Sequence, residues 1–97
     1  MASYRITYWH EIPSQVDVQG EDGEWRPQPL GARFQELIDI VATKRGLFGT
    51  DDYLEGWQRG EIGTAPGSAV EVLATLVADL EARFEGIRVS ALAGRPG

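Results

Sequence analysis

His10 and Glu11 are the only place where an imidazole and a carboxylate are neighbours in the sequence. Imidazole titrates near neutral pH and often transfers protons in catalysis, and the chain has a single histidine. Both residues are expected at a strand end, where consecutive side chains point to opposite faces. His10 and Glu11 are therefore the only catalytic candidates. The preferred interpretation is that this histidine is incidental and has no catalytic role.

Three tryptophans are many for a chain of 97 residues. Tryptophan is enriched both in protein cores and at the centres of interfaces. Strand alternation places Trp9 on the face opposite Tyr4, Ile6 and Tyr8, and we expect helices on only one of these faces. We therefore predict a partner-binding surface that comprises Trp9, Ile12, Pro13, Trp25 and Trp57. The alternative is that the indoles simply pack in the core.

Other polar groups do not complete a known site. Asp51, Asp52 and Glu55 carry oxygens that hard cations prefer, but they lack the spacing of a calcium loop. Helix-start electrostatics after Thr50 explain the two aspartates. The glycines between residues 56 and 67 lack the ending of a phosphate loop, and no serine lies in a nucleophile elbow. We expect neither a metal nor a cofactor.

Composition narrows the class of protein. The length suits one domain with a two-layer core, and the net charge of −6 opposes binding to nucleic acid. The absence of cysteine excludes disulfides and thiolate chemistry. The sequence starts without the apolar stretch of a secretory signal, and no run is long enough for a membrane span. A cytoplasmic location without a membrane partner is expected.

A period of two predicts strands near the amino terminus. Residues 3–10 are rich in aromatic and β-branched types and form the first expected strand. Ile12-Pro13-Ser14 should break it, and a second strand should run from near Ser14 to Gln19. Gly20-Glu21-Asp22-Gly23 has turn chemistry, after which Trp25-Arg26 could pair back. Pro27 and Pro29 should stop this segment or confine it to a sheet edge.

Two helices are predicted from apolar stripes with a period near 3.6 residues. The first begins near Gly31 and ends at Lys44-Arg45-Gly46, where the cations suit the helix dipole and glycine suits the cap. Its stripe consists of Phe34, Leu37, Ile38, Val41 and Ala42. The second opens with a capping box of Ser68 and Glu71. Its stripe consists of Leu73, Leu76, Val77, Leu80 and Phe84.

Two further segments have weaker signals. Tyr53, Leu54 and Trp57 fit one helical turn capped by Thr50, but the glycines at 56, 60 and 63 weaken a helix. A strand over residues 55–62, with a turn before it, is therefore preferred. Residues 87–90 could add a last short strand, and residues 93–97 are expected to form a flexible tail behind a single domain of residues 1–92.

The order of elements is strand, strand, helix, strand, helix and an optional last strand, ββαβα(β). Such an order predicts an α+β two-layer sandwich with a mostly antiparallel sheet and two helices on one face. Ferredoxin-like is the nearest common architecture.

Three blocks of the sequence resemble a known family. They are residues 6–16 (ITYWHEIPSQV), residues 33–39 (RFQELID) and residues 50–57 (TDDYLEGW). Together they resemble the small "virulence factor" domain, which occurs alone or as a module of larger bacterial proteins such as conserved virulence factor C. The resemblance covers roughly residues 4–85. It implies an accessory subunit linked to one-carbon or corrinoid methyl-transfer metabolism, and it carries over no catalytic residues.

Two functional hypotheses follow. The first is a non-enzymatic interaction module, either a homodimer or a subunit that docks on a protein partner through the tryptophan-bearing sheet face and the Ile12-Pro13 corner. The second is a small enzyme or ligand-binding protein that resembles dimeric α+β barrels and has a pocket near His10.

Overall fold

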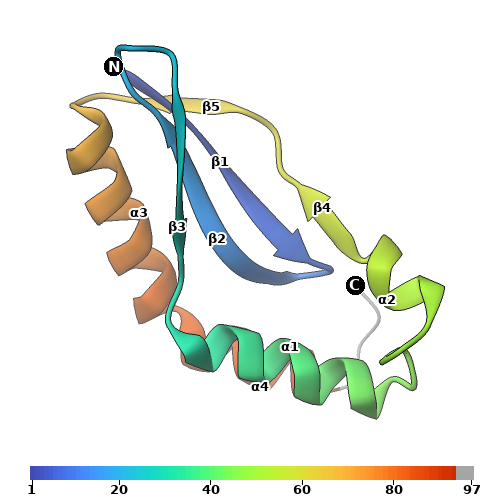
Figure 1. The fold of residues 1–97 in the computed structure, drawn as a ribbon. Coiled ribbons are helices and arrows are strands. Elements are labelled where there is room, and N and C mark those ends of the chain that lie inside the picture. Colours follow the sequence, from blue (N-terminus) through green and yellow to red (C-terminus); the bar gives the residue numbers. More distant parts are fainter. Residues whose placement is uncertain (94–97) are drawn as a thin grey trace.

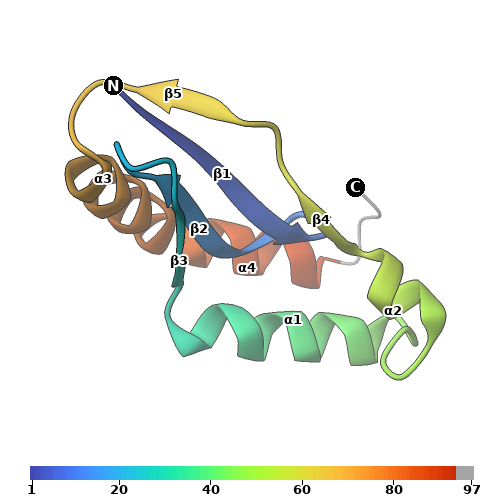
Figure 2. The same cartoon turned by 45° about the horizontal axis from the view of Figure 1, so that its top comes forward.

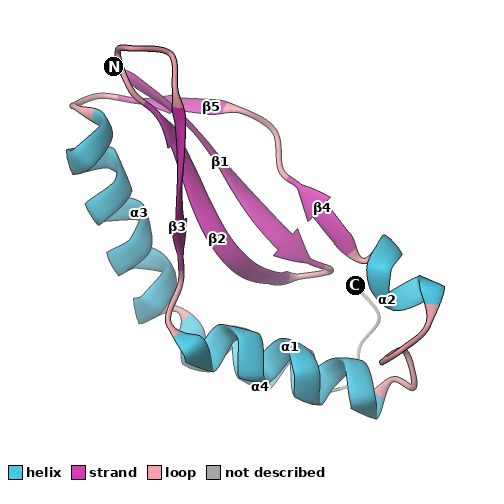
Figure 3. Cartoon of the chain, in the orientation of Figure 1, coloured by secondary structure: helices cyan, strands magenta, loops and turns pink. Residues whose placement is uncertain are grey.

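An antiparallel sheet forms the centre of the protein in the computed structural model, which describes residues 1–93 (Figures 1 and 3). The strands are β1 (Ala2–Trp9), β2 (Ile12–Gln19), β3 (Trp25–Pro29), β4 (Trp57–Arg59) and β5 (Gly63–Ala65). Their order across the sheet is β3-β2-β1-β4, and β5 pairs with the other end of β1 on the same side as β4. β1, the first strand in sequence, is therefore central.

The β1–β2 hairpin turns earlier than the sequence predicted. The two residues between the strands are His10, whose φ is 50°, and Glu11. Pro13 does not break the hairpin, because it lies inside β2 opposite Tyr8, where the register shifts and Ser14 is the extra residue. A β-bulge tolerates proline, because one residue there is left out of the ladder.

β3 closes one edge of the sheet. The Leu30 N–H donates to the Ser14 carbonyl, so the N–H groups of residues 26, 28 and 30 face β2. Pro27 and Pro29 therefore occupy the positions whose amide nitrogens point outward. The prediction that these prolines confine the segment to an edge is confirmed.

β4 and β5 form the other edge, where the sequence predicted one strand over residues 55–62. The pairing register along β1 shifts by one residue between β4 and β5. Thr7 pairs with Arg59 and Tyr4 pairs with Gly63, so a step of three residues in β1 corresponds to four residues on the other side. One extra residue therefore lies between these two short strands. Gly60 allows the close approach there, since a Cβ on it would lie 3.0 Å from the Ile6 carbonyl oxygen.

Both predicted amphipathic helices form, but the second ends at Ala82, so Phe84 of its predicted stripe lies in the next helix, and Val72, outside that stripe, is buried with Leu80. α1 (Ala32–Lys44) buries the five predicted residues of its stripe, and Gly46 adopts a left-handed φ of 72° after it. α3 (Ala69–Ala82) opens with the predicted reciprocal capping box between Ser68 and Glu71. α3 packs against β1 and β2, and Figure 2 shows α1 running beside α4 (Phe84–Leu92).

Two further helices lie in segments for which the sequence favoured a turn or a strand. α2 (Asp51–Glu55) is the helical turn that the strand interpretation set aside, with the Thr50 hydroxyl accepting a hydrogen bond from Tyr53 N–H. The optional last strand over residues 87–90 is wrong, because these residues lie in α4. Phe84, Ile87 and Ala91 are spaced by three and four residues and face the core in that helix. The predicted tail starts at Ala93, and residues 94–97 lie outside the described part.

The core fills the space between one sheet face and the helices. Tyr4 and Ile6 pair across the hairpin with Val18 and Val16 and pack against the buried helical residues. The opposite face is polar: Arg5 pairs with Asp17, and Thr7 pairs with Gln15. The protein is thus an α+β fold consistent with a ferredoxin-like two-layer sandwich. Within residues 1–93, no helix combines the length and apolarity that crossing a bilayer requires.

Candidate functional site: an apolar corner beside a sheet edge

Trp9 lies inside the protein, contrary to the prediction that it faces a partner. Its side chain is 0% exposed, between its cross-strand neighbours Ile12 and Trp57. The indole Nε1 donates a hydrogen bond of 2.8 Å to the Tyr53 carbonyl of α2. Pairing on both sides and the cover of α2 together bury this end of β1. The alternation of side chains along β1 predicts which face Trp9 is on, but it does not reveal that α2 covers that face.

Ile12 and Pro13 are also buried, so the corner that they were expected to offer to a partner is part of the core. Pro13 is among the largest fully buried side chains, opposite Tyr8. The bulge at Ser14 increases the local twist of the hairpin and turns these residues inward. They support the fold and contribute no surface for docking.

The catalytic candidates His10 and Glu11 diverge. The His10 ring is exposed and lies edge-on against Trp9, with ring centroids 4.4 Å apart. Glu11 turns the other way, and its Oε2 accepts a hydrogen bond of 3.3 Å from Arg45. Its Oε1 is 3.1 Å from the same nitrogen but is buried without a hydrogen bond of good geometry, so we regard this pair as ionic. The geometry assembles no acid–base pair from these neighbours.

Glu11 also lines a surface cavity of about 590 Å³ beside the junction of α3 and α4. The other lining residues are Ala82, Arg83, Gly86, Ile87 and Ser90. Arg83 is the last capping residue of α3 and lies directly before α4. Its N–H donates to the carbonyls of both Asp79 and Leu80 at this junction. His10 does not line this cavity.

Trp25 lies on the polar sheet face and is half-buried. The Arg5 guanidinium lies 4.5 Å from the centroid of its ring, within the range of a cation–π contact. Arg5 also pairs with Asp17 at 3.4 Å, and Gln15 donates to the same carboxylate at 2.9 Å. The expected tryptophan-bearing face is therefore a polar network with one indole that is already engaged.

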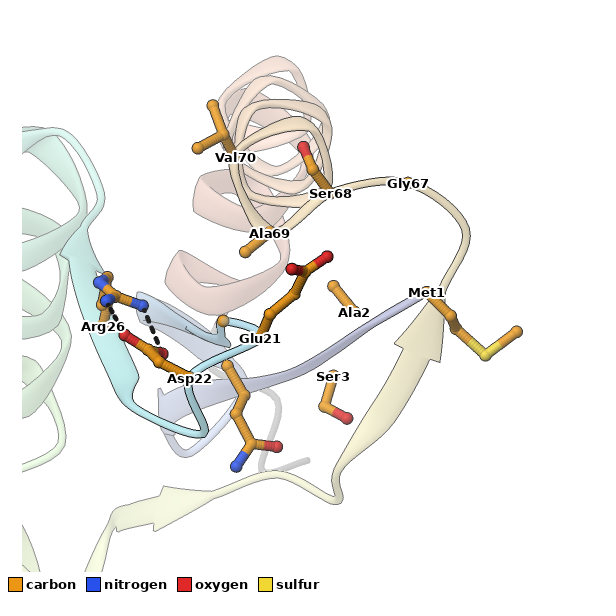
Figure 4. Close-up of a pocket in the computed structure, with 12 residues that line it drawn as sticks. Met1, Ala2, Ser3, Glu21, Asp22, Arg26, Gly67, Ser68, Ala69 and Val70 are labelled. Atoms are coloured by element: carbon orange, nitrogen blue, oxygen red, sulfur yellow. Dashed lines mark hydrogen bonds and ion pairs between the residues drawn. The ribbon is translucent and has the colours of Figure 1, made fainter.

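A second hollow lies at the opposite end of the sheet (Figure 4). It has a volume of about 470 Å³ and lies between the start of β1, the β2–β3 turn and the start of α3. The Asp22–Arg26 ion pair holds that turn, and hydrogen bonds to Arg26 and to the Glu24 backbone lower the pKa of Asp22. The Ser68 backbone and side chain lower the pKa of Glu71. Internal partners thus already satisfy these polar groups.

Four apolar side chains lie on and beside α2, and we call them the apolar corner. They are Phe48, Tyr53, Leu54 and Trp57. Phe48 is 59% exposed and Leu54 is 64% exposed. Tyr53 connects this surface to the core, since its ring centroid lies 5.6 Å from those of Phe48 and Trp9 and 6.3 Å from that of Trp57. The corner is therefore an aromatic cluster packed on the buried Trp9, with a phenylalanine and a leucine open to solvent.

Acidic side chains border the apolar corner. Asp51, Asp52 and Glu55 belong to α2 and are exposed, and no ion pair within residues 1–93 involves them. The two aspartates also favour the start of α2, next to the Thr50 cap. Among the described residues, no three histidine, cysteine or acidic side chains converge as metal ligands.

Leu54 and Phe48 were missed as surface residues, although the sequence held a signal for Leu54. Tyr53 and Leu54 are consecutive, and a one-turn helix cannot bury two neighbouring side chains against the same surface. Once Tyr53 packs inward, Leu54 must face outward. Phe48 gives no comparable signal, since the loop before Thr50 has no periodicity.

The family model described as "virulence factor" matches residues 7–93, and the chain belongs to that family. No curated protein and no solved structure matches the chain significantly. The match contains all but the first residue of the block at 6–16 and the whole of the blocks at 33–39 and 50–57.

Proposed function

We propose that the protein is a non-enzymatic interaction module, an accessory subunit that docks on a larger protein through the apolar corner. The observation that carries the proposal is the exposure of Phe48 and Leu54 around Tyr53, whose ring packs between Phe48 and the buried Trp9. Exposed apolar clusters with a polar rim are typical of protein-binding sites, and rigid aromatic residues lose little entropy on binding.

The charge around the corner indicates the class of partner. Three acids border it and the chain carries a net charge of −6, so a second copy would bring like charges together. A partner surface with apolar residues and flanking lysines or arginines complements it. We therefore favour a heterologous partner over the homodimer. The link to one-carbon or corrinoid methyl transfer is a prediction from the family resemblance alone.

The enzymatic alternative, with a pocket near His10, gains no specific support. Neither of the two cavities described above is lined by His10. Gly56 packs against its ring, since a Cβ there would lie 2.8 Å from His10 Nε2. The alternative stays a hypothesis, and a ligand whose binding is lost in His10→Ala would revive it.

The test compares two pairs of exposed apolar residues. Tagged wild-type protein captures partners from lysate of its own source, and the captured protein is then purified and titrated by calorimetry. Leu54→Ser should weaken binding by about 1–2 kcal/mol, roughly 5- to 30-fold in Kd, and Phe48→Ser should act in the same direction.

The matched controls are Ile40→Ser and Val89→Ser, at helix positions that are 55% and 56% exposed. They remove comparable apolar surface elsewhere and should leave the Kd within about twofold, because exposed substitutions away from the contact act weakly. Binding that is equally insensitive to all four changes would contradict docking at the apolar corner.

A further inference from the structure

The two edges of the sheet differ in their free hydrogen-bonding groups. At the β3 edge, residues 25, 27 and 29 face outward, and Pro27 and Pro29 remove two of these three donors. At the other edge, Gly60 N–H donates to the Ile6 carbonyl and His10 N–H donates to the Gly56 carbonyl. Residues 56, 58 and 60 thus face β1, and Trp57 and Arg59 direct their backbone groups outward.

β5 continues this open edge. Gly63 and Ala65 pair with Tyr4 and Ala2, whose backbone groups point toward this side of β1, so Thr64 faces outward. Among residues 1–93, no strand pairs with the outer side of β4 or β5, so the sheet does not use the outward amides of Arg59 and Thr64. The Trp57 N–H, directly after α2, donates to the Leu54 carbonyl, and only its carbonyl remains outward. An unpaired row of donors and acceptors is a template for another strand.

The open edge runs directly into the apolar corner. Trp57 belongs to both, because its backbone begins the edge while its ring contacts Tyr53. Exposed Glu55 and Glu61 lie on either side of β4 in the sequence, with Arg59 as the basic residue between them. A strand added here would therefore lie beside both the apolar corner and its acidic border.

We propose that the β4–β5 edge binds an extended segment of the partner protein as an additional strand, with alternating apolar and basic side chains. The inference rests on the proposed function and specifies its binding mode. Main-chain hydrogen bonds to the Arg59 N–H and C=O and to the Trp57 C=O supply affinity, and the apolar corner receives a side chain at the end of the added strand. Lysine or arginine side chains of the segment face Glu55 and Glu61.

The experiment uses a random decapeptide library displayed on phage and selected against the full-length protein. Selected peptides are synthesised, and their Kd is measured by fluorescence polarisation. Enrichment of alternating apolar and basic residues is expected. Arg59→Pro should weaken binding about tenfold or more, because it removes an outward donor without breaking a bond to β1. Arg59→Ala, which keeps the backbone donor, should stay within about threefold.

A second measurement avoids any change to the protein. Two peptides are compared, one N-methylated at the odd-numbered amides and the other at the even-numbered amides. Only one of them should lose binding, because only every second amide of an added strand faces the edge. Failure to enrich such peptides, binding that ignores N-methylation, or equal binding to Arg59→Pro would overturn the added strand. A dimer by light scattering that Arg59→Pro dissociates would also overturn it, since a second copy would then occupy the edge.

The two proposals fail separately. Peptides or a purified partner that lose affinity with Leu54→Ser but not with Arg59→Pro would retain the apolar corner as the docking site and remove only the added strand.

Discussion

Arg33 and Glu81 join the start of α1 to the end of α3. Arg33 Nε and Nη2 donate to Glu81 Oε1 at 3.0 Å and 2.8 Å, and Nη2 also donates to the Glu81 carbonyl at 2.7 Å. The other carboxylate oxygen accepts the Gly31 N–H at 2.6 Å, at the capping position of α1. One carboxylate therefore caps α1, which has no side-chain cap of its own.

This arrangement makes stability depend on pH. The Gly31 N–H, with help from Arg33, holds the pKa of Glu81 below its ordinary value. The stabilisation is therefore complete above the unfolded-state pKa and is lost as the pH falls through the folded-state pKa. Glu81→Gln should cost on the order of 1 kcal/mol at pH 7, and this difference from wild type should shrink below about pH 4.

Urea denaturation at pH 7 and pH 3.5 measures the effect. Glu36→Gln removes the same charge from an exposed position of α1 and is the matched control. A Glu81→Gln deficit that is equal at both pH values would show that the carboxylate charge does not stabilise α1.

The helical stripe of α1 yields a second prediction. Ile38 is 0% exposed and Ile40 is 55% exposed, two residues apart in the same helix. Ile38→Asp buries an unpaired charge and should cost more than about 4 kcal/mol, enough to unfold a domain of this size. Ile40→Asp should change stability by less than about 1 kcal/mol. Circular dichroism of the two variants distinguishes them, and comparable folding of both would refute the assigned core.

Burial of Trp9 leads to the third prediction. Trp9→Phe removes the part-buried hydrogen bond to the Tyr53 carbonyl and leaves a cavity at a fully buried position, with an expected loss of about 2–3 kcal/mol. Trp25→Phe, on the polar face, should cost less than about 1 kcal/mol. Thermal unfolding followed in the far ultraviolet should show a much lower Tm for Trp9→Phe only. Equal shifts would argue against the anchoring role of the Trp9 indole.

Two glycines provide the fourth prediction. A Cβ on Gly56 would lie 2.7 Å from Trp9 Nε1, whereas a Cβ on Gly86 would meet nothing within 4 Å. Because Trp9 has no room to move, Gly56→Ala should destabilise the protein by about 1–3 kcal/mol. Gly86→Ala should stabilise α4 by about 0.5–1 kcal/mol. Opposite shifts of the urea midpoint are expected, and a stabilising Gly56→Ala would contradict the packing at Trp9.

Local periodicity was sufficient for the elements that carry their own signal. The stripe of α1 lies within one helix, and the Ser68 capping box lies within one turn, so tertiary contacts were not needed to predict either. The outward prolines of β3 follow from the same kind of local chemistry. The fold class followed from the order of these elements.

Other features depend on contacts that a single segment does not reveal. Four residues such as 87–90 cannot separate a period of two from a period of 3.6, so α4 looked like a strand. Trp9 is buried because Trp57 and Tyr53, more than 40 residues later, cover it. Of the apolar corner, only Trp57 was predicted, and Phe48 and Leu54 were missed because α2 becomes a surface only when Tyr53 docks on Trp9.

The central position of β1 bears on how the chain matures on the ribosome. Its first neighbour, β2, emerges directly after it, but its second neighbours are β4 and β5, at residues 57–65. A nascent chain that has exposed only the hairpin and α1 therefore carries an unsatisfied central strand. Completion of the sheet must await synthesis of residues 57–65, and until then the open side of β1 can pair with a wrong strand.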